Sequence, residues 1–120
     1  LGAGNMATAL IRGLTAAKLY KPSQIVVSDA EAGKRATAKR RLGVAAVADN
    51  RAAVAAARVV VLAVKPQVID AVMDELRPAV TPRHLFVSIA AGVTTRRMHA
   101  HLGERTRIVR VMPNTPALLG

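Results

Sequence analysis

The stretch that decides the fold lies at the start of the chain, where residues 1–10 read LGAGNMATAL. Residues 2–7, GAGNMA, match the pattern G-x-G-x-x-G/A, which forms a tight turn between a strand and a helix. Gly2 would make the turn, Gly4 would let the backbone approach a pyrophosphate, and Ala7 would let the helix pack closely on the strand. The pattern predicts a dinucleotide site, although a glycine-rich turn alone also fits a purely structural role.

The strand that should precede this turn is represented by Leu1 alone. A turn of this kind follows a strand, so we expect Leu1 to be the last residue of a central strand cut away from this chain. Five or so apolar strand residues would contribute roughly 1.5–3 kcal/mol each when buried, which is comparable with a domain's net stability of roughly 5–15 kcal/mol. We therefore expect the 120 residues to be a fragment that is inactive alone.

Short β-branched runs alternate with alanine-rich segments along the rest of the chain. The runs predict strands at residues 24–29, 59–64, 85–90 and 107–113, with a weaker candidate at 45–48. Helices are predicted at residues 5–17, 31–42, 50–57, 66–77 and 94–102, where Asn50 is the expected N-cap of the third. This order predicts an α/β fold, a Rossmann-like, doubly wound and mainly parallel sheet, in one domain over residues 1–120.

The composition narrows the classes of function. The 52% of hydrophobic residues suffices for a core, and no apolar run reaches the roughly 20 residues of a membrane span, so we expect a cytoplasmic protein with no membrane partner. The net charge of +11 is compatible with nucleic acid, but Tyr20 and Phe86 offer no stacking surface, so we expect no nucleic-acid partner. The basic segment 33–41 is interpreted as an exposed helix face.

Metal binding is not predicted. The chain contains no cysteine, His99 and His101 are two positions apart and would not share a helix face, and His84 is expected in a loop. No acidic residue completes a ligand set or a catalytic triad. We therefore predict no metal and no catalytic residue within this chain.

The end of the strand at 24–29 bears on the choice between the two nicotinamide dinucleotides. Asp29 could accept a hydrogen bond from a ribose 2′-hydroxyl, which favours NAD, or could cap the helix that begins near Glu31. Ser28 could instead donate to a 2′-phosphate, and Lys34 or Arg35 could neutralise its charge, which favours NADP. These residues leave the choice open.

Three further segments follow predicted strands: LAVKP (62–66), SIAAGVT (88–94) and RVMPNTPALLG (110–120). Ligands of doubly wound sheets bind beyond the carboxyl ends of the strands, where small residues let a flat ring approach the backbone. Tight packing of a turn would explain the same small residues. Lys65 could take part in the chemistry or simply be solvated, and the turn MPNTP could bind a ligand or merely leave the domain.

In this order and spacing, GAGNMATAL, LAVKP, SIAAGVT and RVMPNTPALLG closely resemble the N-terminal domain of the pyrroline-5-carboxylate reductase family. The resemblance covers essentially the whole chain, and its last two motifs are more specific than the glycine turn. It implies reduction of 1-pyrroline-5-carboxylate to L-proline, the last step of proline biosynthesis, with hydride from NADPH or NADH. NADP is the more usual cofactor in that family, so NADP is expected and NAD is possible. The resemblance also implies a helical C-terminal domain that forms the homo-oligomer and holds most of the substrate, and we expect the present 120 residues to lack it.

The resemblance also implies where the cofactor lies. Its cofactor-binding set comprises Gly2, Ala3, Gly4, Asn5, Met6 and Ala7 at the pyrophosphate, Ser28 and Asn50 at the adenosine side, and Ala63, Val64, Lys65, Pro66, Ala90, Ala91 and Gly92 at the nicotinamide side. Asn114 and Thr115 would lie near the substrate. The alternatives are another NADP-dependent reductase with the same first domain, such as a β-hydroxyacid dehydrogenase, and a non-catalytic nucleotide-binding module.

Overall fold

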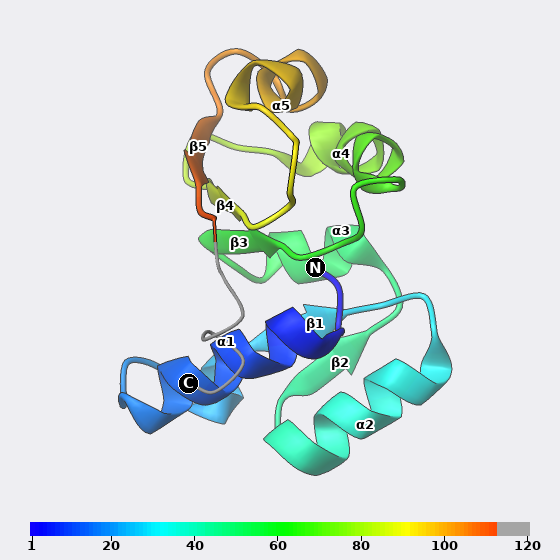
Figure 1. Cartoon of the computed structure of the whole chain (residues 1–120), viewed down its shortest axis with the longest axis vertical. Coiled ribbons are helices and arrows are strands. Elements are labelled where there is room, and N and C mark those ends of the chain that lie inside the picture. The colour runs from blue at the N-terminus through cyan, green and yellow to red at the C-terminus, as the bar shows by residue number, and fades with distance from the viewer. Residues whose placement is uncertain (113–120) are drawn as a thin grey trace.

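Helices and strands alternate along the chain in the computed structural model, which describes residues 1–112 (Figure 1). In chain order the main elements are α1 (Asn5–Ala16), β1 (Val26–Ser28), α2 (Ala32–Leu42), β2 (Ala45–Val47), α3 (Asn50–Ala55), β3 (Val59–Leu62), α4 (Ile69–Leu76), β4 (Leu85–Ser88), α5 (Thr95–Leu102) and β5 (Arg107–Arg110). Short 3₁₀ turns lie at Pro22–Gln24 and Arg77–Ala79. The predicted elements, including the weak strand candidate at 45–48, are all present.

The strands form two parallel groups, β1 with β2 and β3 with β4 and β5. Leu1 and Gly2 connect the groups: the Leu1 nitrogen donates to Val61 O at 2.6 Å, and Gly2 N donates to Ser28 O at 2.8 Å. Ala63 N in turn donates to Leu1 O at 2.8 Å. The chain thus winds outward from Leu1 to one side through β1 and β2 and to the other through β3, β4 and β5, which confirms the Rossmann-like α/β prediction.

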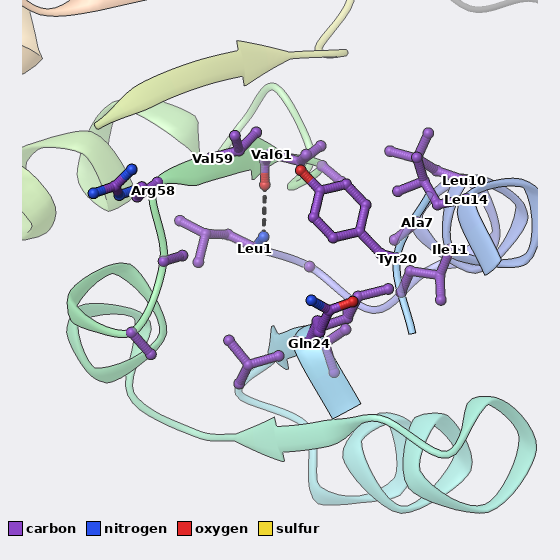
Figure 2. Close-up of a pocket in the computed structure, with 17 residues that line it drawn as sticks. Leu1, Ala7, Leu10, Ile11, Leu14, Tyr20, Gln24, Arg58, Val59 and Val61 are labelled. Carbon is purple, nitrogen blue, oxygen red and sulfur yellow. Dashed lines mark hydrogen bonds between the residues drawn. The ribbon is translucent and has the colours of Figure 1, made fainter. Parts of the chain in front are cut away.

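An apolar groove separates β1 from β3 on either side of Leu1 (Figure 2). Its walls include Leu10, Leu14, Ile25 and Val59, and Tyr20 reaches over it from the end of the segment that follows α1. Burial lowers the pKa of the Leu1 ammonium to about 6, and the negative charge of Asp29 only partly opposes this shift. The groove therefore favours uncharged, apolar atoms.

Two clusters of buried side chains hold the helices on the strands. The larger lies around β3 and β4 and consists of Val54, Val60, Leu62, Ile69, Met73, Leu76, Phe86, Ala90, Val93, Met98 and Leu102. The smaller lies around β1 and consists of Ile11, Val27, Ala38 and Val44. Burial alternates along β3 and β4, where Val60, Leu62, Phe86 and Ser88 are buried and their neighbours are more exposed.

Two helix starts differ from the predictions. The third helix is capped by Asp49 and not by Asn50, because Asp49 Oδ1 accepts from Arg51 N at 2.9 Å. The fourth begins at Ile69 and not at Pro66, because Val68 N donates to Lys65 O at 3.1 Å and closes a separate turn first. The second helix ends as predicted at Gly43, whose φ of +68° is a conformation that favours glycine.

His84 lies in the expected loop, but it is buried and not exposed to solvent. Its Nδ1 accepts from Thr81 N at 3.0 Å, so its Nε2, 3.0 Å from Val54 O, carries the proton and donates. The imidazole thus ties the loop before β4 to α3. No helix within residues 1–112 has the length and apolar character needed to cross a membrane.

Candidate dinucleotide site

The glycine turn lies at the point where the two groups of strands meet. Gly2 has a φ of +93°, and a Cβ there would lie 2.7 Å from Ala63 O, so the turn accepts no larger residue. Ala7 is buried behind the turn, as expected for the small third residue. Gly2 N also bonds to Ser28 O, so the turn is held against the carboxyl ends of both β1 and β3.

Gly4 differs from Gly2 because the protein itself does not require its small size. A Cβ at Gly4 would meet no atom within 4 Å, and its φ of −82° suits any residue. Gly4 is the N-cap of α1, with no side chain bonded to the first amides of that helix. Such an N-terminus attracts anions, and the open space beside Gly4 gives a phosphate access to it.

Asp29 follows β1 and binds the backbone of two separate segments. Its Oδ2 accepts from Ala3 N at 3.0 Å and its Oδ1 accepts from Glu31 N at 2.9 Å. Arg35 lies over the same loop, where its Nη1 donates to Asp29 O at 2.9 Å and to Ala30 O at 3.0 Å. The carboxylate therefore braces the start of α2 and the glycine turn together.

Ser28, the last residue of β1, is buried beside the glycine turn. It has no exposed surface, and its hydroxyl donates to Asn50 Oδ1 at 2.7 Å. The amide of Asn50 in turn donates to Glu75 Oε2 on α4 at 3.5 Å. The buried hydroxyl of Ser28 thus orients Asn50, and the contact of Ser28 with the adenosine ribose stays a prediction.

The expected nicotinamide side is formed by the ends of β3 and β4, which are paired neighbours. Ala63 packs on the glycine turn, and Ala90 is buried, with its N–H bonded to Ser88 Oγ at 3.3 Å. Gly92 has a φ of +71° with open space beside it. The exposed members of the predicted cofactor-binding set are Asn5, Lys65, Pro66, Ala91 and Gly92, and Asn50 is partly buried.

A second groove, between α1 and α2, was not predicted from the sequence. It is lined by Gly4, Thr8, Arg12, Glu31, Lys34 and Arg41, among others. The spacing of four residues from Gly4 to Thr8 to Arg12 was a signal that these residues share a helix face. Three cationic side chains against one carboxylate make the surroundings of the glycine turn favourable for phosphate groups.

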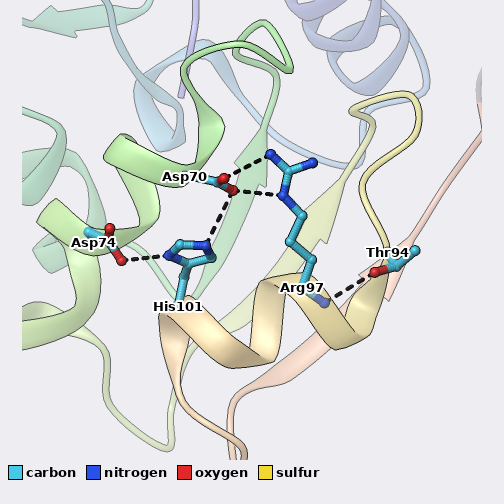
Figure 3. Close-up of polar contacts among 5 residues, drawn as sticks. All are labelled: Asp70, Asp74, Thr94, Arg97 and His101. Atoms are coloured by element: carbon cyan, nitrogen blue, oxygen red, sulfur yellow. Dashed lines mark hydrogen bonds and ion pairs between the residues drawn. The ribbon is translucent and has the colours of Figure 1, made fainter.

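The polar cluster between α4 and α5 lies elsewhere and is structural (Figure 3). Arg97 makes two hydrogen bonds to the carboxylate of Asp70, at 2.9 and 2.8 Å, and His101 Nδ1 lies 2.6 Å from Asp74 Oδ1. The hydrogen bond from Arg97 is the chief cause that lowers the pKa of Asp70. In the part of the chain that the structure describes, no group of His, Asp or Glu side chains could hold a metal ion.

The structure brings together the glycine turn, the end of β1 with Asn50, and the ends of β3 and β4. These parts come from five separate stretches of sequence. Asn114 and Thr115, expected near the substrate, lie outside the described residues 1–112.

A sequence profile of the family described as NADP oxidoreductase coenzyme F420-dependent matches residues 1–92. Pyrroline-5-carboxylate reductase of Pseudomonas aeruginosa is 49% identical over 119 residues, which are 99% of this chain and 43% of that protein. The enzyme of that name from Haemophilus influenzae is 44% identical over 120 residues, 100% of this chain and 44% of that protein. The chain therefore spans less than half the length of these relatives.

Two solved structures have the same arrangement. A pyrroline-5-carboxylate reductase from Coxiella burnetii matches with a TM-score of 0.92 and 42% identity over 98% of this chain and 44% of that one. Plasmodium falciparum pyrroline carboxylate reductase, solved with NADP bound, matches with a TM-score of 0.84 and 26% identity over 98% of this chain and 42% of that one.

Proposed function

This chain belongs to the family described as NADP oxidoreductase coenzyme F420-dependent, and from that membership we propose that its glycine turn binds a nicotinamide dinucleotide, NADP in preference to NAD. The observation that carries the proposal is the position of Gly2, which is bonded to the end of β1 and packed against the end of β3. Dinucleotides bind at this kind of switch point, with the pyrophosphate on the N-terminus of the first helix.

The preference for NADP is supported by charge. Arg12, Lys34 and Arg41 surround the groove next to Gly4, and Arg35 lies over the loop after β1. Only Glu31 offsets them in that groove. A 2′-phosphate adds negative charge on this side of the ligand, so these cations favour NADP.

The reaction that fits best is reduction of 1-pyrroline-5-carboxylate to L-proline, a step of proline biosynthesis. The matched relatives are named pyrroline-5-carboxylate reductases, after this reaction. The nicotinamide supplies the hydride, and this chain's residues bind the pyrophosphate, orient the ring and exclude water. Residues 63–66 and 90–92 would face the nicotinamide, with Asn114 and Thr115 towards the substrate. We further propose that residues outside this chain hold the imine and form a homo-oligomer, in the cytoplasm.

A chimera tests both the cofactor and the reaction. Residues 1–120 replace the matching 43% of the Pseudomonas aeruginosa relative, and oxidation of NADPH is followed with and without 1-pyrroline-5-carboxylate. Turnover that requires the imine supports the proposal. Binding of NADPH without turnover of the imine would leave a nucleotide-binding module, and turnover of a 3-hydroxy acid instead would identify the β-hydroxyacid alternative.

Gly4→Ala is the variant that tests the position of the pyrophosphate. The protein leaves room for the added methyl group. The free energy of unfolding should therefore change by less than about 1 kcal/mol, the usual scale of an N-cap substitution. The methyl group would nevertheless stand where the backbone must approach the phosphates, and affinity for NADPH should fall about tenfold or more. Gly13→Ala, which also meets no atom within 4 Å but lies two turns along α1, is the matched control with unchanged affinity.

A further inference from the structure

The carboxylate of Asp29 stands where an acidic residue in this fold can accept from the ribose 2′-hydroxyl and thereby select NAD. In this chain both of its oxygens accept backbone N–H groups. Oδ2 bonds to Ala3 N, within the glycine turn, at 3.0 Å, and Oδ1 bonds to Glu31 N, at the start of α2, at 2.9 Å. Each carboxylate oxygen of Asp29 is thus bonded to the backbone of the protein itself.

The bond to Ala3 is long-range, since 26 residues separate the two partners. It supplements the bond from Gly2 N to Ser28 O, so two consecutive residues of the turn are held by two consecutive residues at the end of β1. A pyrophosphate on this turn would be bound by amides whose direction depends on these contacts. The position of the turn therefore depends on Asp29, whichever dinucleotide is bound.

The charge around Asp29 also argues against a role in excluding NADP. Two backbone N–H groups stabilise its carboxylate, and the guanidinium of Arg35 is anchored on the carbonyls of Asp29 and Ala30, at 2.9 and 3.0 Å. A cation at this loop offsets the repulsion that a carboxylate would exert on a 2′-phosphate.

We propose that Asp29 is a positioning residue, which holds the glycine turn in its binding geometry and does not discriminate between NADP and NAD. The proposal rests on the proposed function only in that the turn binds a dinucleotide. It predicts that loss of the carboxylate lowers the affinity for both cofactors by the same factor. If the carboxylate instead selected NAD, its removal would lower the affinity for NAD and raise the affinity for NADP.

Asp49 provides a matched control. It follows β2 as Asp29 follows β1, and its Oδ1 accepts from the backbone N of Arg51, two residues on, at 2.9 Å. This bond has the same spacing and length as the bond from Glu31 N to Asp29. Asp49 has no bond to the glycine turn among the described residues, so Asp49→Asn reproduces the local change without the long-range one.

The first measurement is the affinity of the wild-type chimera and of its Asp29→Ala, Asp29→Asn and Asp49→Asn variants for NADPH and NADH. Asp29→Ala should lower the affinity for NADPH and for NADH about tenfold each. The ratio of the two dissociation constants should stay unchanged within about twofold. Asp29→Asn should recover part of the loss, because its amide oxygen can still accept one of the two bonds. Asp49→Asn should leave both affinities unchanged.

The second measurement is hydrogen exchange at the Ala3 amide, which needs no ligand. In Asp29→Ala this amide should exchange at least about tenfold faster, while amides in β3 and β4 keep their wild-type rates. A change in the ratio of NADPH to NADH affinity, or unchanged exchange at Ala3, would overturn the positioning role. Failure of the wild-type protein to bind either dinucleotide would overturn the proposed function instead, and the exchange at Ala3 would still decide the role of Asp29.

Discussion

Gly2 and Ala63 are in such close contact that a single methyl group on Gly2 would lie 2.7 Å from the carbonyl oxygen of Ala63. The residues are 61 positions apart, and Ala63 immediately follows β3. This contact holds the glycine turn at the centre of the fold. It explains why the first glycine of the pattern is required by the protein, whereas Gly4 beside it leaves room for a ligand.

Gly2→Ala should therefore destabilise the protein. The new side chain combines a close backbone contact with a φ of +93°, and strain of this kind costs roughly 1–3 kcal/mol. Urea unfolding, followed by circular dichroism, measures the loss. Gly13→Ala, in the interior of α1 and free of close contacts, should instead stabilise by roughly 0.5–1 kcal/mol. Equal midpoints for the two variants would contradict the close contact at Gly2.

Ser28→Ala should affect Asn50 more than it affects the core. The methyl group fits the space of the hydroxymethyl group, but Asn50 Oδ1 loses the donor at 2.7 Å, and we expect a loss of roughly 0.5–1.5 kcal/mol of stability. If Asn50 contacts the adenosine side of the cofactor, affinity for NADPH falls as well. Calorimetric titration of the chimera measures the affinity, and Ser23→Ala, at an exposed serine, is the control. An unaltered affinity in Ser28→Ala would show that Ser28 does not position a cofactor-binding group.

The pairing of Asp70 with Arg97 should make the free energy of unfolding depend on pH. The hydrogen bond from Arg97 lowers the pKa of Asp70 below its usual value of 3.8, so the folded state binds the proton less tightly than the unfolded state does. The stabilisation of the folded state by this pair is fully present at a pH above 3.8. It is lost as the pH falls through the lowered pKa of Asp70 in the folded state. His101 and Arg97 on α5 face Asp70, with Asp74 one turn away on α4 (Figure 3).

The test compares urea midpoints of wild type and Arg97→Gln across the acid range. The wild type should be the more stable at neutral pH, and the difference should shrink below about pH 4 as Asp70 becomes protonated. Added salt should reduce the difference at neutral pH, because the pair is exposed. A difference that persists unchanged in acid would assign the effect to packing of Arg97 and not to its ion pair.

The groove between β1 and β3 should accept one extended strand. Leu1 already bonds to Val61 and Ala63, and Gly2 bonds to Ser28, in positions that a parallel strand between β1 and β3 would continue (Figure 2). Five β-branched residues fused before Leu1 should raise stability by several kcal/mol, at roughly 1.5–3 kcal/mol for each buried side chain.

Urea unfolding and the fluorescence of Tyr20, the only tyrosine in the sequence, report on this strand. Tyr20 lines the groove, so its emission should change when the groove is filled. An extension of five alternating glycine and serine residues is the control and should give little stabilisation. If the two extensions behave alike, the groove does not take up a strand.

The order of elements and the ends of several of them could be predicted because they depend on local chemistry. Gly43 ends α2 through its positive φ, and the apolar runs at 59–62 and 85–88 form parallel strands in which every second residue is buried. The N-cap at Asp49 and the late start of α4 at Ile69 could not be placed to the residue, since neighbouring polar residues and short turns compete for the same amides.

By itself the sequence determined the α/β class, the glycine turn and the motifs that resemble one reductase family, because glycine conformations, apolar periodicity and motif spacing are properties of short segments. The tertiary structure alone decided that Ser28 turns inward to Asn50 and that Asp29 also braces Ala3 in the glycine turn. The bonds from Ser28 to Asn50 and from Ala3 to Asp29 join residues 22 and 26 positions apart, and a linear pattern contains no such distances.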